Sequence, residues 1–210
     1  MQCWRNVLLT DSGFYFNNKL GKPLDPLINC LQAMLKKPFA EAKVLFIPTA
    51  AMENERKAKE ITERLTSELL AMGFIVNNIT IHDIDGSLTV NDAMQFDIIY
   101  ITGGKTPYLA ERVRASGFDE IIEGMIYANK VYIGMSAGSA LLASHFNAND
   151  AGNQKFVGLG FLNAYISVHC GDTPIREDLP LPHIALKENQ AIELFWNGYK
   201  LIDGNLQYIN

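Results

Sequence analysis

Val131-Tyr132-Ile133-Gly134-Met135-Ser136-Ala137-Gly138 is the stretch in which a strand pattern changes to a helix pattern. Its first residues are β-prone, and residues 137–144 are rich in helix formers. Ser136 is therefore predicted on a sharp strand-to-helix turn, in the Gly-x-Ser-x-Gly arrangement of a nucleophile elbow. The glycines two residues before and after Ser136 lack the bulk that would keep this turn from closing. The turn would leave the Ala137 N–H unsatisfied at a helix N-terminus, where negative charge is favoured.

Apolar strand patterns alternate with amphipathic helix patterns before this turn. Strands are expected at residues 6–10, 43–50, 79–84 and 96–102, and helices at residues 25–36, 54–72 and 107–115. This alternation predicts an α/β fold with a mostly parallel sheet covered by helices on both faces, in a single domain over residues 1–210. Ligands of such sheets bind at the carboxyl ends of the strands.

The pattern changes after the turn. Short strands are expected at residues 165–168, 184–186, 191–196 and 199–202. The last two flank Asn197-Gly198, a typical hairpin turn, whereas residues 171–182 contain three prolines and are expected to form an exposed loop.

Composition narrows the function classes. The chain has 210 residues, of which 48% are hydrophobic, and 18 Lys and Arg against 23 Asp and Glu give a net charge of −5. No dense basic run indicates a nucleic-acid partner, and no apolar run is long enough to span a membrane. Three cysteines match neither a disulfide framework nor a zinc site, which favours the reducing cytoplasm. Without a nucleic-acid partner, we expect a small-molecule substrate. No motif for a metal, nucleotide or other cofactor is present, so we expect no cofactor.

A serine hydroxyl needs a neighbouring base before it becomes a strong nucleophile, so one of the four histidines must reach Ser136. His169 is the best placed, because it follows the strand-like residues 165–168 and should emerge, like Ser136, at the carboxyl end of a strand. His82, His145 and His183 are expected to be structural or surface residues.

Three segments together carry a family resemblance: Tyr100-Ile101-Thr102-Gly103-Gly104-Lys105-Thr106, Ile133-Gly134-Met135-Ser136-Ala137-Gly138-Ser139 and Ile166-Ser167-Val168-His169. In order and spacing they resemble peptidase family S51, which includes dipeptidase E and, more distantly, cyanophycinase. The resemblance spans most of the chain. It implies a fold similar to flavodoxin and the class I glutamine amidotransferases, and a triad of serine, histidine and a carboxylate.

The same resemblance implies roles for particular residues. Ser136 matches the nucleophile and His169 the general base. Glu188, in Leu186-Lys187-Glu188-Asn189, is the preferred third member because it follows a strand, and Asp150 is the alternative acid. Either carboxylate would have to accept the His169 Nδ1–H, which fixes the tautomer of the ring.

The Gly103-Gly104 turn and Ala137 are expected to form an oxyanion hole from backbone N–H groups. Lys105 stands where the family commonly has asparagine, so the preference of dipeptidase E for an N-terminal aspartate does not transfer directly. Lys105, Thr106 and Arg176 are the candidate substrate-binding residues, since a lysine or arginine there can attract a carboxylate.

The predicted function is therefore that of a serine peptidase, which cleaves short peptides, including dipeptides with N-terminal Asp, through an acyl-enzyme on Ser136. The protein is expected to be a monomer or a homodimer. Two alternatives are an esterase or amidase of another serine hydrolase class and a non-catalytic, amidotransferase-like binding module. In an α/β-hydrolase esterase the acid precedes the histidine in the chain, so the position of the acid discriminates between the classes.

Overall fold

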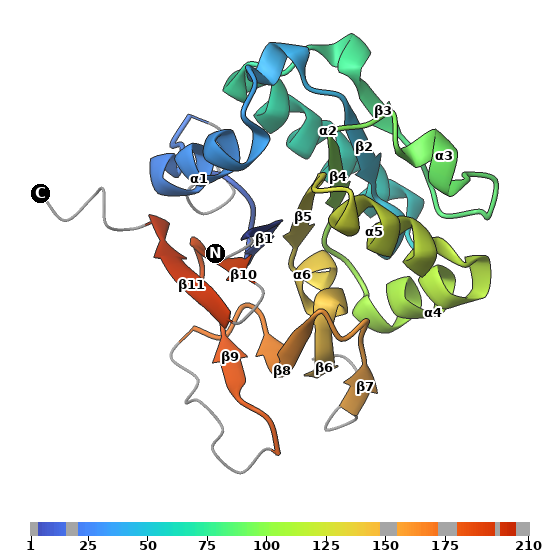
Figure 1. Ribbon diagram of the computed structural model, residues 1–210, viewed down its shortest axis with the longest axis vertical. Helices are drawn as coiled ribbons and strands as arrows, with labels where there is room; N and C mark the ends of the chain where they lie inside the picture. Colours follow the sequence, from blue (N-terminus) through green and yellow to red (C-terminus); the bar gives the residue numbers. More distant parts are fainter. Residues whose placement is uncertain (1–3, 16–20, 148–154, 172–179, 196–197, 205–210) are drawn as a thin grey trace, which may run out of the picture.

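The computed structural model describes residues 4–15, 21–147, 155–171, 180–195 and 198–204 (Figure 1). Its main sheet has seven strands in the order β11-β10-β1-β5-β4-β2-β3. These strands are β1 (Trp4–Thr10), β2 (Val44–Ile47), β3 (Ile79–Ile81), β4 (Ile98–Ile101), β5 (Val131–Met135), β10 (Gln190–Phe195) and β11 (Gly198–Asp203). The five strands from β1 to β3 in this order are parallel, and the β10–β11 hairpin pairs antiparallel with β1. The predicted mostly parallel α/β sheet is confirmed.

Helices cover both faces of this sheet. On one face α1 (Asp25–Leu35) and α2 (Glu55–Met72) bury leucines against strand residues such as Phe46 and Tyr100. On the other face α3 (Val90–Ala93), α4 (Thr106–Ser116), α5 (Phe118–Tyr127) and α6 (Ala137–Leu142) pack against strand residues that include Ile101 and Tyr132. Alternate residues of each strand point to opposite faces, which is why the continuous apolar strands divide into two cores.

A second sheet follows the elbow, in the lower part of Figure 1. Its four strands have the order β7-β6-β8-β9, with bounds β6 (Ala143–Asn147), β7 (Lys155–Val157), β8 (Leu162–Ser167) and β9 (His183–Ala185). Phe146, Ile166 and Ile184 of this small sheet belong to the same buried cluster as Leu9 and Ile101 of the main sheet. The small sheet is therefore attached to the main body through a shared hydrophobic core.

The predicted elements before residue 136 are present, with short 3-10 turns, η2 (Phe39–Glu41), η3 (Thr49–Ala51) and η4 (Val76–Asn78), between them. The expected helix over residues 137–144 is shorter than predicted, because it ends at Leu142 and the chain continues as β6. His145 and Phe146 of β6 pair with Tyr165 and Ile166 of β8, so this tertiary pairing overrides the local helix preference.

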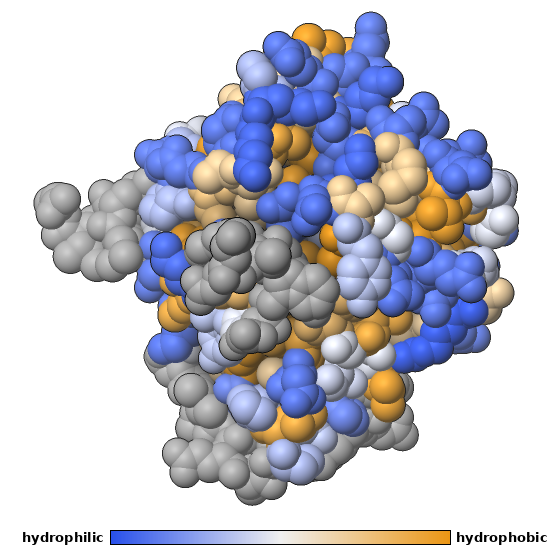
Figure 2. All heavy atoms as spheres, in the orientation of Figure 1, coloured by the Kyte–Doolittle hydropathy of each residue, from blue (hydrophilic) through white to orange (hydrophobic). Residues whose placement is uncertain are grey.

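The exterior shown in Figure 2 is mostly hydrophilic, with smaller hydrophobic areas between the charged residues. No helix in the described ranges is both long and apolar enough to cross a membrane.

The glycines of the elbow lie where the chain has no room for a side chain. A Cβ on Gly134 would lie 2.7 Å from the backbone of Gly138, and a Cβ on Gly138 would clash with the Ile101 carbonyl oxygen of β4. Gly138 thus lets α6 approach β4 closely, and the start of α6 carries the Ser136 turn. The two glycines set the position of Ser136 relative to the sheet.

We expect Gly138→Ala to lower the free energy of unfolding by at least about 2 kcal/mol, because the added methyl group meets backbone that cannot move aside cheaply. The control is Gly124→Ala in α5, where a Cβ would meet only the ends of the Val90 and Met94 side chains. Alanine favours a helix interior, so the control should be nearly neutral. Urea denaturation measures both variants, and equal stabilities would contradict the close-approach argument.

Candidate active site

Ser136 occupies the turn between β5 and α6, as the sequence predicted. Its backbone has φ 50° and ψ −105°, a strained conformation for a residue with a side chain. The Ser136 N–H donates to the Thr10 carbonyl oxygen at 3.0 Å, and the glycines on either side let the turn close. The fold therefore holds the serine in the geometry of a nucleophile elbow.

His169 is the histidine that reaches this serine. It follows β8 by two residues, and its Nε2 lies 2.8 Å from Ser136 Oγ. Its own backbone has φ 57°, in the left-handed region, so the chain turns sharply after β8 to direct the ring at Ser136. A serine hydroxyl at this distance can donate its proton to a neutral imidazole nitrogen.

Asp11 binds the other side of His169. Its Oδ2 lies 3.1 Å from His169 Nδ1, and its Oδ1 accepts the His169 backbone N–H at 2.5 Å. The residue directly follows β1 and is fully buried. One carboxylate thus fixes both the ring and the backbone of the histidine, and it selects the tautomer with a proton on Nδ1 and a free electron pair on Nε2.

The structure differs here from the sequence prediction of the third member. Glu188 lies in the connection between β9 and β10 with an exposed side chain, and Asp11 is the carboxylate in contact with the His169 ring. The alternative acid, Asp150, lies outside the described residues. The sequence did contain a signal for Asp11, because an aspartate directly after a buried parallel strand lies at the edge of the sheet where ligands bind.

Asp11 also changes the acid–base properties of the histidine. The pKa of His169 is raised above its ordinary value, first by the side-chain hydrogen bond to Asp11, and further by the negative charges of Asp11 and Glu188, against an opposing effect of burial. Glu188 is therefore close enough to act on the ring through its field. Its expected role as the orienting acid is filled geometrically by Asp11.

The turn after β4 lies next to Ser136. A Cβ added to Gly103 would lie 3.1 Å from Ser136 Cβ, so the turn after β4 lies directly against the serine. Among the described residues, the N–H groups of Gly103, Gly104 and Ala137 have no hydrogen-bond acceptor. N–H groups without an acceptor can stabilise a developing oxyanion, so Gly103, Gly104 and Ala137 stay candidates for the oxyanion hole.

The candidate substrate-binding residues are found in different places. Lys105 caps α4 and forms an ion pair with Glu53, with Nζ 3.0 Å from Glu53 Oε2 and both side chains nearly half exposed. Thr106 is the first residue of α4, and Arg176 lies outside the described residues. Next to Gly104, a pocket of about 400 Å³ is lined by η3, the start of α2 and Lys105.

The other histidines lie away from the serine. His183 Nε2 is 2.9 Å from Ser167 Oγ, the His145 ring stacks on Tyr165, and His82 Nε2 lies 3.6 Å from Asp85 Oδ1. The described part of the chain contains no cluster of three His, Cys, Asp or Glu side chains suited to a metal ion.

The chain order of the three contacting residues is Asp11, Ser136, His169. Asp11 precedes the histidine, as the acid of an α/β-hydrolase esterase does, so the order of acid and histidine alone does not separate a peptidase of this fold from an esterase. In those esterases the acid also follows the serine, whereas Asp11 precedes it, and this difference argues against the esterase. The contact between Ser136 and His169 also argues against a vestigial elbow in a non-catalytic module.

Comparisons with known proteins show which family the chain is similar to. The model of the family described as "Peptidase family S51" matches residues 8–200. An uncharacterized peptidase of Pasteurella multocida is 26% identical over 179 residues, which covers 77% of this chain and 85% of that protein. An uncharacterized peptidase of Listeria monocytogenes is 29% identical over 147 residues, which covers 69% of this chain and 70% of that protein.

Solved structures show the same fold. A crystal structure of a candidate peptidase E from Listeria monocytogenes EGD-e superposes with a TM-score of 0.70 at 20% identity, over 96% of this chain and 99% of the other. A peptidase from an acI-B1 actinobacterium gives a TM-score of 0.64 at 19% identity, over 94% of this chain and 86% of the other. With a family match that spans nearly the whole chain, this protein belongs to peptidase family S51 and is a serine-type hydrolase of peptide bonds.

Proposed function

We propose that this protein hydrolyses short peptides through an acyl-enzyme on Ser136. The observation that carries the proposal is the continuous contact from Ser136 Oγ to His169 Nε2 at 2.8 Å and from His169 Nδ1 to Asp11 Oδ2 at 3.1 Å. Such a chain of contacts lets the imidazole remove the serine proton while the carboxylate stabilises the imidazolium that results.

The reaction follows from this geometry. Ser136 Oγ attacks the peptide carbonyl carbon as its proton moves to His169 Nε2, and the carbonyl oxygen becomes an oxyanion held by N–H groups of Ala137 and of Gly103 or Gly104. His169 then gives the proton to the leaving amine as the C–N bond breaks. Water, deprotonated by the same histidine, hydrolyses the ester and restores the Ser136 hydroxyl.

The family relationship supports a short peptide as the substrate, and dipeptides with an N-terminal Asp are one group within that class. Next to the Gly103-Gly104 turn, a positive and a negative charge lie together, because Lys105 is paired with Glu53. The pair neutralises much of the attraction that a lone lysine would exert on a substrate carboxylate. We therefore propose that this protein selects less strongly for acidic residues than an enzyme with a free cation at this position.

Ser136→Ala should abolish hydrolysis of a panel of dipeptides, because no other described hydroxyl lies on His169 Nε2. The measurement is release of free amino acids, together with mass spectrometry of the adduct that a fluorophosphonate forms on the wild-type protein. Ser144→Ala is the matched control, since Ser144 lies in β6 and its hydroxyl bonds to the Leu162 carbonyl. A Ser136→Ala protein that cleaves the panel as fast as wild type would refute the proposal.

Asp11→Asn should reduce kcat by about 10²–10⁴-fold, because the asparagine no longer holds the Nδ1-protonated tautomer or stabilises the imidazolium. Glu188→Gln should leave kcat within about threefold, since its exposed carboxylate acts only through its field. Steady-state kinetics of both variants decide between the two acids. A greater loss in Glu188→Gln than in Asp11→Asn would return Glu188 to the role of orienting acid.

The pH dependence gives an independent test. The base must be neutral, so kcat/KM should fall as pH decreases through the pKa of His169, which lies above its ordinary value. Removing either negative charge lowers this pKa, so the acidic limb of the profile should move to lower pH, further for Asp11→Asn than for Glu188→Gln. An acidic limb that does not move in Asp11→Asn would show that another group controls it.

Glu53→Gln should lower KM for dipeptides with an N-terminal Asp by about two- to fivefold relative to dipeptides with an N-terminal Ala, because it frees the charge of Lys105. Glu60→Gln serves as control, since Glu60 pairs with exposed Arg56 further along α2. Raising the salt concentration should reduce the difference. An unchanged preference would place Lys105 outside the substrate site.

A further inference from the structure

The position of the Gly103-Gly104 turn depends on its contact with Ala50. The Lys105 N–H donates to the Ala50 carbonyl oxygen at 2.7 Å, and a Cβ on Gly104 would clash with the same carbonyl group. The turn therefore rests on the backbone of η3, which follows β2. A displacement of η3 would therefore also move the Gly103-Gly104 turn, which lies next to Ser136.

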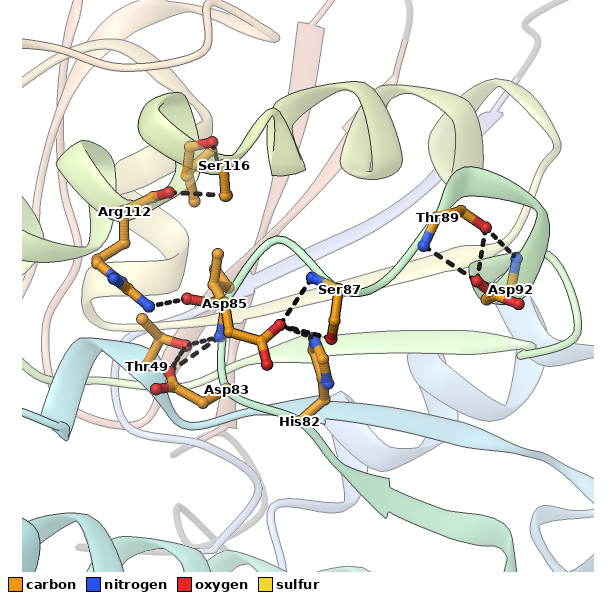
Figure 3. A network of polar contacts seen from close by, with 11 residues as sticks. Thr49, His82, Asp83, Asp85, Ser87, Thr89, Asp92, Arg112 and Ser116 are labelled. Atoms are coloured by element: carbon orange, nitrogen blue, oxygen red, sulfur yellow. Dashed lines mark hydrogen bonds and ion pairs between the residues drawn. The ribbon is translucent and has the colours of Figure 1, made fainter.

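Thr49, the first residue of η3, is held by a buried polar contact. Its side chain is fully buried, its Oγ1 donates to Asp83 Oδ1 at 2.6 Å, and the same oxygen accepts the Ile84 N–H at 3.0 Å. Asp83 Oδ1 also accepts the Ile84 N–H, at 2.9 Å. Figure 3 shows Thr49 of η3 and Asp83, which lies in the connection after β3, turned toward each other. The donor and acceptor together fix the hydroxyl, and with it the backbone of η3.

Arg112 connects this group of hydrogen bonds back to α4. It lies in α4, the helix that begins directly after Lys105, and its Nη2 donates to the Ile84 carbonyl oxygen (Figure 3). Ile84 thus contacts Thr49 through its N–H and Arg112 through its carbonyl. The hydrogen bonds run from Lys105 to Ala50, from Thr49 to Asp83 and Ile84, and back through Arg112 and α4 to Lys105.

We propose that Thr49 and Asp83 are positioning residues for the oxyanion hole, acting through Ala50 on the Gly103-Gly104 turn. The inference rests on the proposed function, because it assumes that this turn stabilises the oxyanion. A donor of this kind works only when it is held within a few tenths of an ångström of its productive position before the reaction begins. This network of hydrogen bonds holds the turn in place through residues that do not touch the substrate.

The location of the Thr49–Asp83 contact favours a role in positioning the oxyanion hole over a role in local stability alone. β3 is a three-residue strand at the edge of the main sheet, and the connection that contains Asp83 follows it directly. The Thr49–Asp83 contact links that connection to η3 at the carboxyl end of the parallel strands, the same edge that carries Asp11 and Ser136. The pair thus joins the outermost strand of the sheet to the turn beside the serine.

The test is Thr49→Val, which keeps the shape of the side chain and removes the hydroxyl. We expect kcat for a dipeptide substrate to fall about 10–100-fold with KM changed less than about threefold, since an oxyanion donor acts mainly in the transition state. Affinity for a peptide aldehyde, whose adduct with Ser136 is tetrahedral, should fall in parallel with kcat. Thr49→Ser restores the hydroxyl and should recover most of kcat and of the aldehyde affinity.

A matched control exists in the same region. Thr89 Oγ1 and Asp92 Oδ2 are also 2.6 Å apart, but they form the capping box at the start of α3, and neither is hydrogen-bonded to η3 in the described part of the chain (Figure 3). Thr89→Val removes an equivalent hydroxyl, so it reports the effect of a lost threonine–aspartate contact on stability alone. It should lower the melting temperature without changing kcat or the aldehyde affinity.

Asp83→Ala provides a second variant in case Thr49→Val does not fold, because Asp83 is only partly buried. It should give the same selective loss of kcat. Wild-type kcat in Asp83→Ala or in folded Thr49→Val, or an equal loss in Thr89→Val, would overturn the inference. Failure of the proposed function has a different signature, which is retention of activity in Ser136→Ala.

Discussion

The contact between Asp11 and His169 is the interaction on which the site depends. Asp11 directly follows β1, an interior strand of the main sheet, whereas His169 follows β8 of the small sheet. The carboxylate is fully buried, and it accepts hydrogen bonds from both the ring and the backbone N–H of the histidine. A buried carboxylate without such partners would be very costly, and these two hydrogen bonds satisfy Asp11 where the small sheet packs on the main sheet. The contact that positions the base therefore also connects the two sheets.

The remaining parts of the site come from one property of parallel sheets. Strands that run in the same direction end at the same edge, so β1, β4 and β5 deliver Asp11, the Gly103-Gly104 turn and Ser136 to one place. Glycine then allows approaches that no other residue permits, between α6 and β4 and between Gly104 and η3. The nucleophile, its acid and the oxyanion donors are thus fixed by backbone geometry. Only the base arrives from outside this sheet.

Some parts of the site depend on local sequence patterns and others on how the two sheets pack, and this difference explains what could be predicted from the sequence. Ser136 was identified because strand, turn and helix patterns are local, and His169 because it follows a strand and matches the family motif. Asp11 also directly follows a strand, but no local pattern shows that it contacts His169, since that contact spans 158 positions of the chain and depends on how the two sheets pack. Glu188 satisfied the same sequence rule, a carboxylate after a short strand, but that strand belongs to the edge of the small sheet and the side chain remains exposed. The sequence predicts short strands in this region but not that they form a separate sheet, because sequence periodicity does not specify which strands pair.

Two residues of the site have a strained backbone conformation, and contacts with neighbouring elements hold it. Ser136 and His169, the two residues that exchange a proton in the proposed reaction, both have positive φ, and such conformations persist only where surrounding contacts outweigh their cost. Around Ser136 these contacts are the hydrogen bond to Thr10 and the packing of α6 on β4. Around His169 they are the two hydrogen bonds to Asp11 and the Cys170 N–H bond to the Leu186 carbonyl oxygen of the β9–β10 connection. Each strained residue thus has one of its contacts at the end of β1. Because both ties converge on β1, through Thr10 and Asp11, this strand sets the distance between nucleophile and base.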